Sequence, residues 1–205
     1  MFFLRFEPIQ FIKFCDFTTK KLNNIPDSVN QYLVKQDLIE KVAFSKNPEG
    51  VVFIANNIEP AVIDDMKKVI YLDHINDPGN MGTIIRTALA FDYDGIMLSN
   101  DCVSIYNEKV VAASKGAIFL LPIGYCDIGE IDKSYKVIVS TLSEKSVNLA
   151  EVKKEDKFVL VLGNEAHGVS EESISRADTM VKIPVNNIDS LNVSVAAGIL
   201  MYSLK

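Results

Sequence analysis

The sequence is poor in cysteine, which argues against two classes of site. Its 205 residues include three cysteines, Cys15, Cys102 and Cys126, which are odd in number, widely spaced and without a CxxC pair. A disulfide framework or a structural zinc site needs paired or clustered cysteines. We therefore expect reduced, mostly buried thiols and no metal.

The sequence also lacks a long apolar segment. A membrane-spanning helix needs about 20 consecutive apolar residues, and no run in the chain approaches that length. An acidic residue, Glu7, comes too early for a secretory signal peptide. With 48% hydrophobic residues, the composition is that of a soluble globular protein, and we expect it in the cytoplasm.

Positive charge is scarce as well. The 21 lysines and arginines are outnumbered by 27 acidic residues, so the formal net charge is −6, whereas nucleic-acid-binding domains are generally basic. This balance argues against a broad nucleic-acid-binding surface, but an enzyme needs only a local basic groove. Such a groove depends on whether Arg86, Lys109 and Lys115 converge on one face.

From about Lys68 onward, short apolar runs alternate with helical patterns. Uniformly apolar strands joined through helices are typical of a parallel sheet covered by helices on both faces. The sequence therefore predicts an α/β domain over 61–205. Its expected strands are 69–72, 95–98, 118–121, 137–140, 158–162 and 180–183, and its expected helices are 82–91 and 193–204.

The first 60 residues have a different pattern and are expected to form a separate layer or small domain. Helix-like stretches cover 11–22 and 28–38, a polar turn covers 45–50, and a β-branched run at 51–55 predicts a strand. The segment 56–60, an Asn pair followed closely by Pro60, interrupts both helix and strand and is the expected exit.

Three loops follow apolar strands and carry the residues of chemical interest. In the first, a helix expected to open with Gly79-Asn80-Met81-Gly82 presents backbone N–H groups that can hold a phosphate. Arg86 is placed about one turn into that helix, among the apolar residues of its buried face. It must reach an exposed pocket or a buried anion, unless it is simply a surface arginine lying along its helix.

The second loop, 160–170, is bounded by glycines. Gly163 allows a ligand close to the backbone, and Glu165 is a carboxylate at a strand end, where charge is costly unless paired. No GxGxxG or GxxxxGK[ST] motif occurs in the chain, which argues against a nucleotide-dependent α/β enzyme unrelated to RNA. Taken alone, the loop could be an ordinary turn.

The third loop, 183–198, leads into the last helix. Ser190 or Asn192 is a suitable helix N-cap, and the small residues of Val193-Ser194-Val195-Ala196-Ala197-Gly198 allow close packing against a ligand, a second subunit or the core.

Together and in this order, the three loops resemble the motifs of the SpoU (TrmH-like) family of RNA 2′-O-methyltransferases, in the SPOUT superfamily. The segment Ala113-Ser114-Lys115-Gly116-Ala117 also resembles that family, so the resemblance covers about Lys68 to the C-terminus. It implies a parallel α/β sheet with a C-terminal trefoil knot, S-adenosylmethionine as cofactor, and a homodimer that packs through the knot region.

The resemblance also implies roles for individual residues. The expected catalytic residues are Arg86, Asn80, Glu165, Ser190 and Asn192. The expected cofactor-binding residues are Thr141, Leu142, Gly163, Ile183, Leu191, Asn192 and Ala196. The expected RNA-binding residues are Arg86, Lys109 and Lys115. We assign no role to His167, and His74, at a strand end, is expected to be a locally hydrogen-bonded structural residue.

Residues 1–60 bear a fainter resemblance to an L30e-like RNA-binding domain in reduced form, best at 46–52. Ribosomal RNA is the favoured substrate and transfer RNA stays open. Two alternatives are an RNA-binding protein of the same fold that does not methylate, and a methyltransferase of the same superfamily that acts on a base.

Overall fold

A computed structural model describes residues 15–18, 29–43, 48, 50–54, 56–164 and 166–205. The chain divides into two compact units, Met1–Glu59 and Pro60–Lys205. The structure does not describe Glu165, nor the side chains of Cys15–Thr18 and Phe53. The expected catalytic role of Glu165 therefore stays a prediction.

The first unit is a small mixed sheet with one helix. Strand β1 (Cys15–Thr18) pairs in parallel with β2 (Asn30–Leu33) and antiparallel with β3 (Val51–Ile54), and α1 covers Gln36–Val42. The strand predicted at 51–55 is confirmed over β3. The helices predicted at 11–22 and 28–38 are wrong over 15–18 and 30–33, because strand pairing overrides a weak local pattern.

The second unit is built on a seven-stranded sheet in which every pairing is parallel. The strand order is β6-β5-β4-β9-β7-β10-β8. The strands are β4 (Lys68–Asp73), β5 (Gly95–Leu98), β6 (Ile123–Tyr125), β7 (Lys136–Ser140), β8 (Val147–Asn148), β9 (Phe158–Gly163) and β10 (Thr179–Lys182). The register aligns Leu72 with both Leu98 and Leu162, so β4, β5 and β9 end near the same edge.

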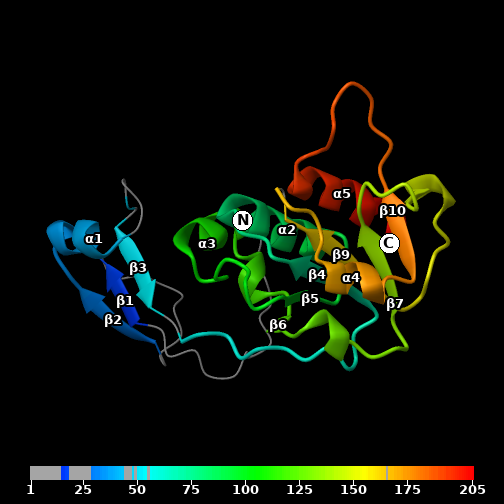
Figure 1. Cartoon of the computed structure of the whole chain (residues 1–205). Coiled ribbons are helices and arrows are strands. Elements are labelled where there is room, and N and C mark those ends of the chain that lie inside the picture. The colour runs from blue at the N-terminus through cyan, green and yellow to red at the C-terminus, as the bar shows by residue number, and fades with distance from the viewer. Residues whose placement is uncertain (1–14, 19–28, 44–47, 49, 55, 165) are drawn as a thin grey trace. The chain divides into compact units, whose positions relative to one another are not determined.

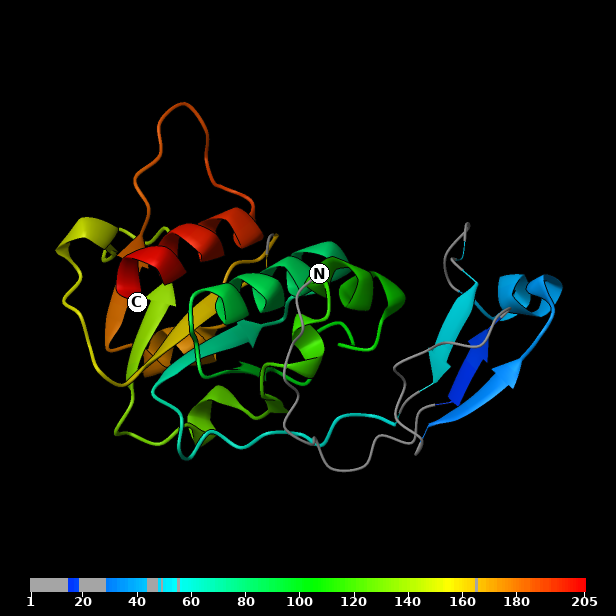
Figure 2. The ribbon, with the colours of Figure 1, turned by 180° about the vertical axis from the view of Figure 1, so that it is seen from behind.

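Helices cover both faces of this sheet, as the sequence predicts (Figures 1 and 2). On one face α2 (Pro78–Ala90) contacts α3 (Glu108–Ser114), α5 (Val193–Leu204) and the short 3-10 helix Ala117–Phe119. On the other, α4 (Glu171–Arg176) contacts the 3-10 helix Ile128–Glu130 over a core that includes Val69, Tyr71 and Val161. A third 3-10 helix covers Leu149–Glu151.

The strand predicted at 118–121 is wrong. Residues Ala117–Phe119 form a 3-10 turn in contact with α2, and the next strand begins at Ile123. Lys115 and Gly116 both have positive φ angles, of 51° and 88°, which turn the chain sharply before the apolar run. A run of four apolar residues suits a buried turn as well as a strand.

Among the described residues, no helix is both long enough and apolar enough to cross a lipid bilayer. Cys102 and Cys126 are free thiols and only partly buried.

Candidate active site

A cavity of about 590 Å³ opens where strands β7, β9 and β10 end. Ligand sites of open parallel sheets lie beyond the carboxyl ends of the strands, which is where this cavity is found. Six of the seven expected cofactor-binding residues line it: Thr141, Leu142, Gly163, Ile183, Leu191 and Ala196. Ser190 also lines the cavity, whereas Asn192 is not among the lining residues.

Gly163 ends β9 at a point where the chain folds back closely on itself. A Cβ atom on Gly163 would lie 2.4 Å from the carbonyl carbon of Gly168, so no larger residue fits without moving the backbone. Asn164 and Gly168 exchange two backbone hydrogen bonds of 2.8 and 2.9 Å, and Gly168 has a φ of 73°. These contacts bring Asn164 and Gly168 together at the edge of the cavity, which both residues line.

The first turn of α5 lines the cavity and is joined by a side-chain contact to the first turn of α2. Asn192 caps α5, since its Oδ1 accepts hydrogen bonds from the backbone N–H groups of Ser194 and Val195. Its Nδ2 donates to Oδ1 of Asn80 over 2.9 Å. The structure thus brings two of the expected catalytic residues into direct contact.

Arg86 is further along α2 than the sequence suggested. It is exposed and lies eight residues after Pro78, the first residue of α2, which is about two turns into the helix rather than one. Within the described part of the chain, no residue forms a hydrogen bond or ion pair with its guanidinium group. The helix therefore leaves Arg86 available to a ligand on its exposed side.

The expected phosphate site at the start of α2 is corrected by the structure. Pro78, at the start of the helix, has no N–H, and the carboxylate of Asp77 accepts a hydrogen bond from Asn80 N–H over 2.7 Å. An anionic side chain of the protein itself therefore occupies this helix terminus, where a phosphate was expected.

Lys109 and Lys115 lie on α3, which packs directly on α2. Lys109 is in the first turn and Lys115 is the C-cap, and both are exposed. The helices touch at Gly82, where a Cβ atom would lie 2.6 Å from the carbonyl oxygen of Val110. The three expected RNA-binding cations are therefore exposed on two adjoining helices, although no contact among them is observed.

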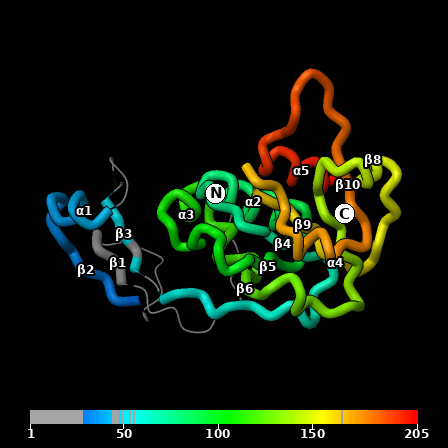
Figure 3. Tube along the Cα trace, in the orientation of Figure 1, coloured from blue at the N-terminus to red at the C-terminus, as the bar shows by residue number. Residues whose placement is uncertain are grey.

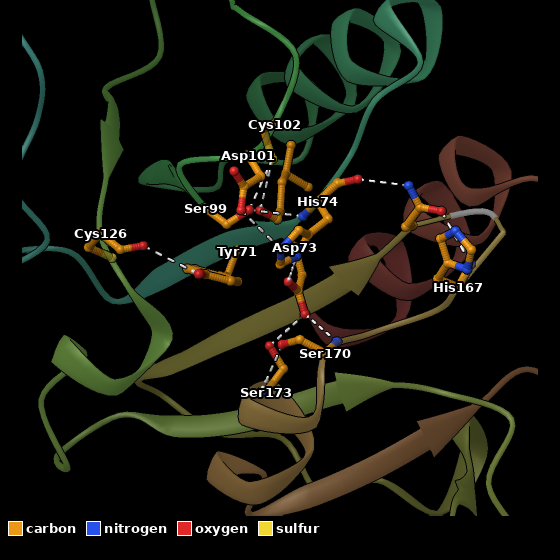
Figure 4. Close-up of polar contacts among 12 residues, drawn as sticks. Tyr71, Asp73, His74, Ser99, Asp101, Cys102, Cys126, His167, Ser170 and Ser173 are labelled. Carbon is orange, nitrogen blue, oxygen red and sulfur yellow. Dashed lines mark hydrogen bonds and ion pairs between the residues drawn. The ribbon is translucent and has the colours of Figure 1, made fainter.

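The sequence interpretation missed a buried carboxylate at the end of β4. Asp73 is 1% exposed, and its Oδ2 accepts hydrogen bonds of 2.7 Å from the Ser170 N–H and the Ser173 hydroxyl (Figure 4). Burial by itself would raise the pKa of Asp73, but the hydrogen bonds from Ser170, Ser173 and His74 outweigh it and hold the pKa below its usual value. The signal was present, because Asp73 is a charged residue that ends an apolar strand.

His74 is locally hydrogen-bonded, as expected. Its Nδ1 lies 2.5 Å from Oδ1 of Asp73, its N–H donates to Ser99 Oγ, and its carbonyl accepts from Asn164 Nδ2 over 2.8 Å. His167 donates its backbone N–H to Asn164 Oδ1.

The sequence matches the family model described as the SpoU rRNA Methylase family over residues 67–202. The chain belongs to the SpoU rRNA methylase family. This match covers most of the second unit, including all three of the loops that carry the expected site residues.

Relatives and solved structures of the SpoU family extend over most of the chain. A Bacillus subtilis relative named 23S rRNA (guanosine(2553)-2′-O)-methyltransferase RlmP is 27% identical over 91% of this chain and 77% of its own length. The crystal structure of an AdoMet-bound rRNA methyltransferase from Sinorhizobium meliloti has a TM-score of 0.83 and 26% identity, covering 94% of this chain and 79% of that one. The crystal structure of the A. aeolicus TrmH/SpoU tRNA modifying enzyme has a TM-score of 0.60 and 28% identity, covering 68% of this chain and 74% of that one.

Proposed function

We propose that this SpoU family member is an RNA methyltransferase that uses S-adenosylmethionine to methylate a ribose 2′-hydroxyl. The observation that carries this proposal is the cavity at the carboxyl ends of β7, β9 and β10, which is lined by residues of the second and third loops. The relative RlmP is named for this reaction, and the S. meliloti structure is described as AdoMet-bound.

The cavity suits this cofactor in size and chemistry. Its volume of about 590 Å³ lies within the roughly 300–1,000 Å³ typical of small-molecule sites. The side chains of Leu142, Ile183 and Leu191 offer apolar surface to an adenine ring, and the strand ends offer backbone polar groups. When bound, S-adenosylmethionine supplies a methyl group on a sulfonium, a transfer that requires alignment rather than a metal.

Arg86 is the residue that we assign to the attacking hydroxyl. A ribose hydroxyl is a weak nucleophile, so the enzyme must share its proton or stabilise the charge that develops on oxygen. Because an arginine remains protonated at any physiological pH, Arg86 is suited to electrostatic stabilisation rather than to proton abstraction. Asn80, joined to Asn192, orients the ribose or Arg86, and Ser190 shapes the cavity wall beside it.

We infer that Arg86, Lys109 and Lys115 contact the RNA, with ribosomal RNA favoured and transfer RNA the alternative. All three are exposed on the adjoining helices α2 and α3. The first unit is assigned a supporting role in RNA binding as a reduced L30e-like domain. In support, the alignment with RlmP covers 91% of the chain, which is more than the second unit alone. We propose that the reaction takes place in the cytoplasm.

We also infer a trefoil knot in the C-terminal segment. After β10, which lies beyond β7 in the sheet, the chain returns to place α5 against α2 and β9 (Figure 3). Residues of that return path line the same cavity as 140–143, Gly163, Asn164 and Gly168. A passage of the chain between those loops would make the knot and the cofactor site one structure.

A homodimer through α5 is the proposed assembly. Val195, Ile199 and Tyr202, at positions i, i+4 and i+7, are 52, 38 and 63% exposed. This spacing places them on one side of the helix, and an apolar stripe of this kind is suited to a symmetric contact with a second copy.

The test is a map of methylated nucleotides in ribosomal and transfer RNA from cells with and without the gene. We expect one 2′-O-methylated position to disappear and to return with the intact gene but not with Arg86→Ala. Loss of a methylated base instead would establish a base methyltransferase. An unchanged map, together with RNA binding by the purified protein, would establish a non-catalytic RNA-binding protein.

A further inference from the structure

We propose that Asp73 is a positioning residue whose buried carboxylate holds the loop 164–170 in place and thereby sets the shape of the cavity. The inference rests on the proposed function in so far as the cavity binds S-adenosylmethionine. Asp73 itself is not among the residues that line the cavity, so any effect on binding has to act through the loop.

The carboxylate of Asp73 joins two segments about a hundred residues apart. Its Oδ2 accepts from the N–H of Ser170 and from the hydroxyl of Ser173, which is completely buried (Figure 4). Ser170 is the N-cap of α4, and it lies two residues beyond Gly168, which borders the cavity. The far end of the loop is therefore attached to the end of β4.

The near end of the loop is attached to the neighbouring residue, His74. The side chain of Asn164 donates from Nδ2 to the His74 carbonyl over 2.8 Å, and its Oδ1 accepts from the N–H groups of Ala166 and His167. Asp73 also contacts the ring of His74 through its other carboxylate oxygen. Both ends of the loop are thus attached to the Asp73–His74 pair.

Hydrogen bonds with residues that follow β5 fix the position of the Asp73–His74 pair. The N–H of His74 donates to Ser99 Oγ over 2.9 Å, and Cys102 Sγ donates to the Leu72 carbonyl over 3.2 Å. His74 has a φ of 59°, a conformation that a residue other than glycine keeps only where its surroundings require it.

A carboxylate is the side chain that this position requires. Three donors converge on Asp73, from Ser170, Ser173 and His74, and an ionised carboxylate can accept from all of them at both oxygens. An asparagine has the same shape but presents an NH₂ group to one set of donors. If the NH₂ group faces Ser170 and Ser173, the N–H of Ser170 loses its acceptor. If the NH₂ group faces His74 instead, the amide oxygen still accepts from both serines but without the charge that strengthens these bonds, so either orientation weakens the attachment of the loop.

The experiment measures cofactor affinity and local mobility in the full-length protein. We compare wild type, Asp73→Asn and Val69→Ala by calorimetric titration with S-adenosylmethionine, by steady-state kinetics and by amide hydrogen exchange. Val69 is fully buried in the same strand and contacts the core on the α4 side, so Val69→Ala controls for a general loss of stability.

For Asp73→Asn we expect the Kd and KM for S-adenosylmethionine to rise about tenfold, the effect of losing one buried hydrogen bond, with kcat changed less than twofold. Hydrogen exchange should accelerate selectively over residues 163–173. For Val69→Ala we expect affinity to stay near the wild-type value at temperatures where the protein is folded. Wild-type affinity in Asp73→Asn, or a loss of affinity equal to that of Val69→Ala, would overturn the inference.

A milder pair of variants covers the case in which Asp73→Asn does not fold. Ser173→Ala removes one donor to Asp73, whereas Ser175→Ala, on the same helix, removes only an exposed bond to the Glu171 carbonyl. We expect weaker cofactor binding and faster exchange of the loop in Ser173→Ala alone, and equal behaviour of the two would overturn the inference. If wild type itself does not bind S-adenosylmethionine, the proposed function fails, and the exchange of residues 163–173 still decides whether Asp73 positions the loop.

Discussion

The side-chain amide of Asn192 donates a hydrogen bond to Oδ1 of Asn80 across 112 positions of sequence. The contact joins the first turn of α2 to the N-cap of α5, two segments that the sequence could only place in separate loops. It also gives Asn192 two separable tasks, since Oδ1 caps α5 while Nδ2 reaches Asn80.

The two tasks of Asn192 predict different results for two substitutions. Asn192→Asp keeps a good N-cap but loses the donor to Asn80, whereas Asn192→Ala loses both. We expect Asn192→Ala to lower the free energy of unfolding by about 1 kcal/mol and Asn192→Asp to change it little. Methyl transfer should fall in both, so full activity in Asn192→Asp would contradict a role for the Asn80 contact. Urea unfolding and a methyl-transfer assay are the measurements.

Replacing Arg86 should separate cofactor binding from chemistry. Arg86 is exposed on α2 and is not among the residues that line the cavity, so Arg86→Ala should leave the Kd for S-adenosylmethionine within twofold of wild type. Loss of a charge-stabilising donor typically costs about 10²–10³-fold in rate, and we expect a fall of that size in single-turnover methyl transfer. Arg86→Lys keeps the charge and should recover part of the rate; near-normal transfer by Arg86→Ala would refute the assigned role.

The position of the cofactor is tested by two aspartate substitutions in the same loop. Leu191 lines the cavity, whereas Ile188 does not and is 56% exposed. Leu191→Asp should weaken S-adenosylmethionine binding at least about tenfold, because a carboxylate in an apolar wall is costly to desolvate. Ile188→Asp, which adds the same charge nearby, should bind as wild type does. Equal affinity of the two variants in a calorimetric titration would mean that the cofactor lies elsewhere.

The dimer proposal is tested by Ile199→Arg, which puts a charge in the middle of the exposed stripe on α5. Sedimentation velocity over a range of concentrations should show a dimer for wild type and a monomer for the variant. Val62→Arg is the control, since Val62 is also apolar and 73% exposed but lies outside α5. A monomeric wild-type protein, or a dimer that persists in Ile199→Arg, would contradict the proposal.

The depressed pKa of Asp73 predicts how acid affects stability. A carboxyl whose pKa is lower in the folded than in the unfolded protein stabilises the fold above its unfolded value, and this contribution is lost as the pH falls through the folded pKa. Wild type should therefore exceed Asp73→Asn in free energy of unfolding by a constant amount near neutral pH. The difference should shrink as the pH drops below about 4, near the usual value of 3.8. Urea unfolding between pH 7 and 3 measures it, and a constant difference throughout would contradict the assignment.

The sequence predicted the second unit well because its strands are uniformly apolar. The runs near 69–72, 95–98, 137–140, 158–162 and 180–183 all became strands of one parallel sheet. Short elements were missed or wrong, because four apolar residues before Pro122 fit a turn as well as a strand. In the first unit, the pairing partners of β1 are distant in sequence, so a local pattern could not reveal them.

The site was predictable as a set of loops but not as a set of contacts. The residues expected around a cofactor do line one cavity, except for Asn192, whose side chain is turned to Asn80 and to the start of α5. The network around Asp73 was missed because its donors, Ser170 and Ser173, lie about a hundred positions away. Only the folded chain shows that a strand-end carboxylate has these partners.

The position of β9 in the sheet has a consequence for the order of events during synthesis. β9 lies between β4 and β7, and β10 lies between β7 and β8. A nascent chain that has not yet emerged from the ribosome as far as Phe158 therefore has one group of paired strands, β4 to β6, and two strands, β7 and β8, without their partners. Unpaired strand edges invite association with other chains, and pairing of this long range is slow. The ribosome must therefore release nearly the whole methylase unit before its sheet can close, which makes the late-emerging C-terminal third the step at which chaperones would matter most.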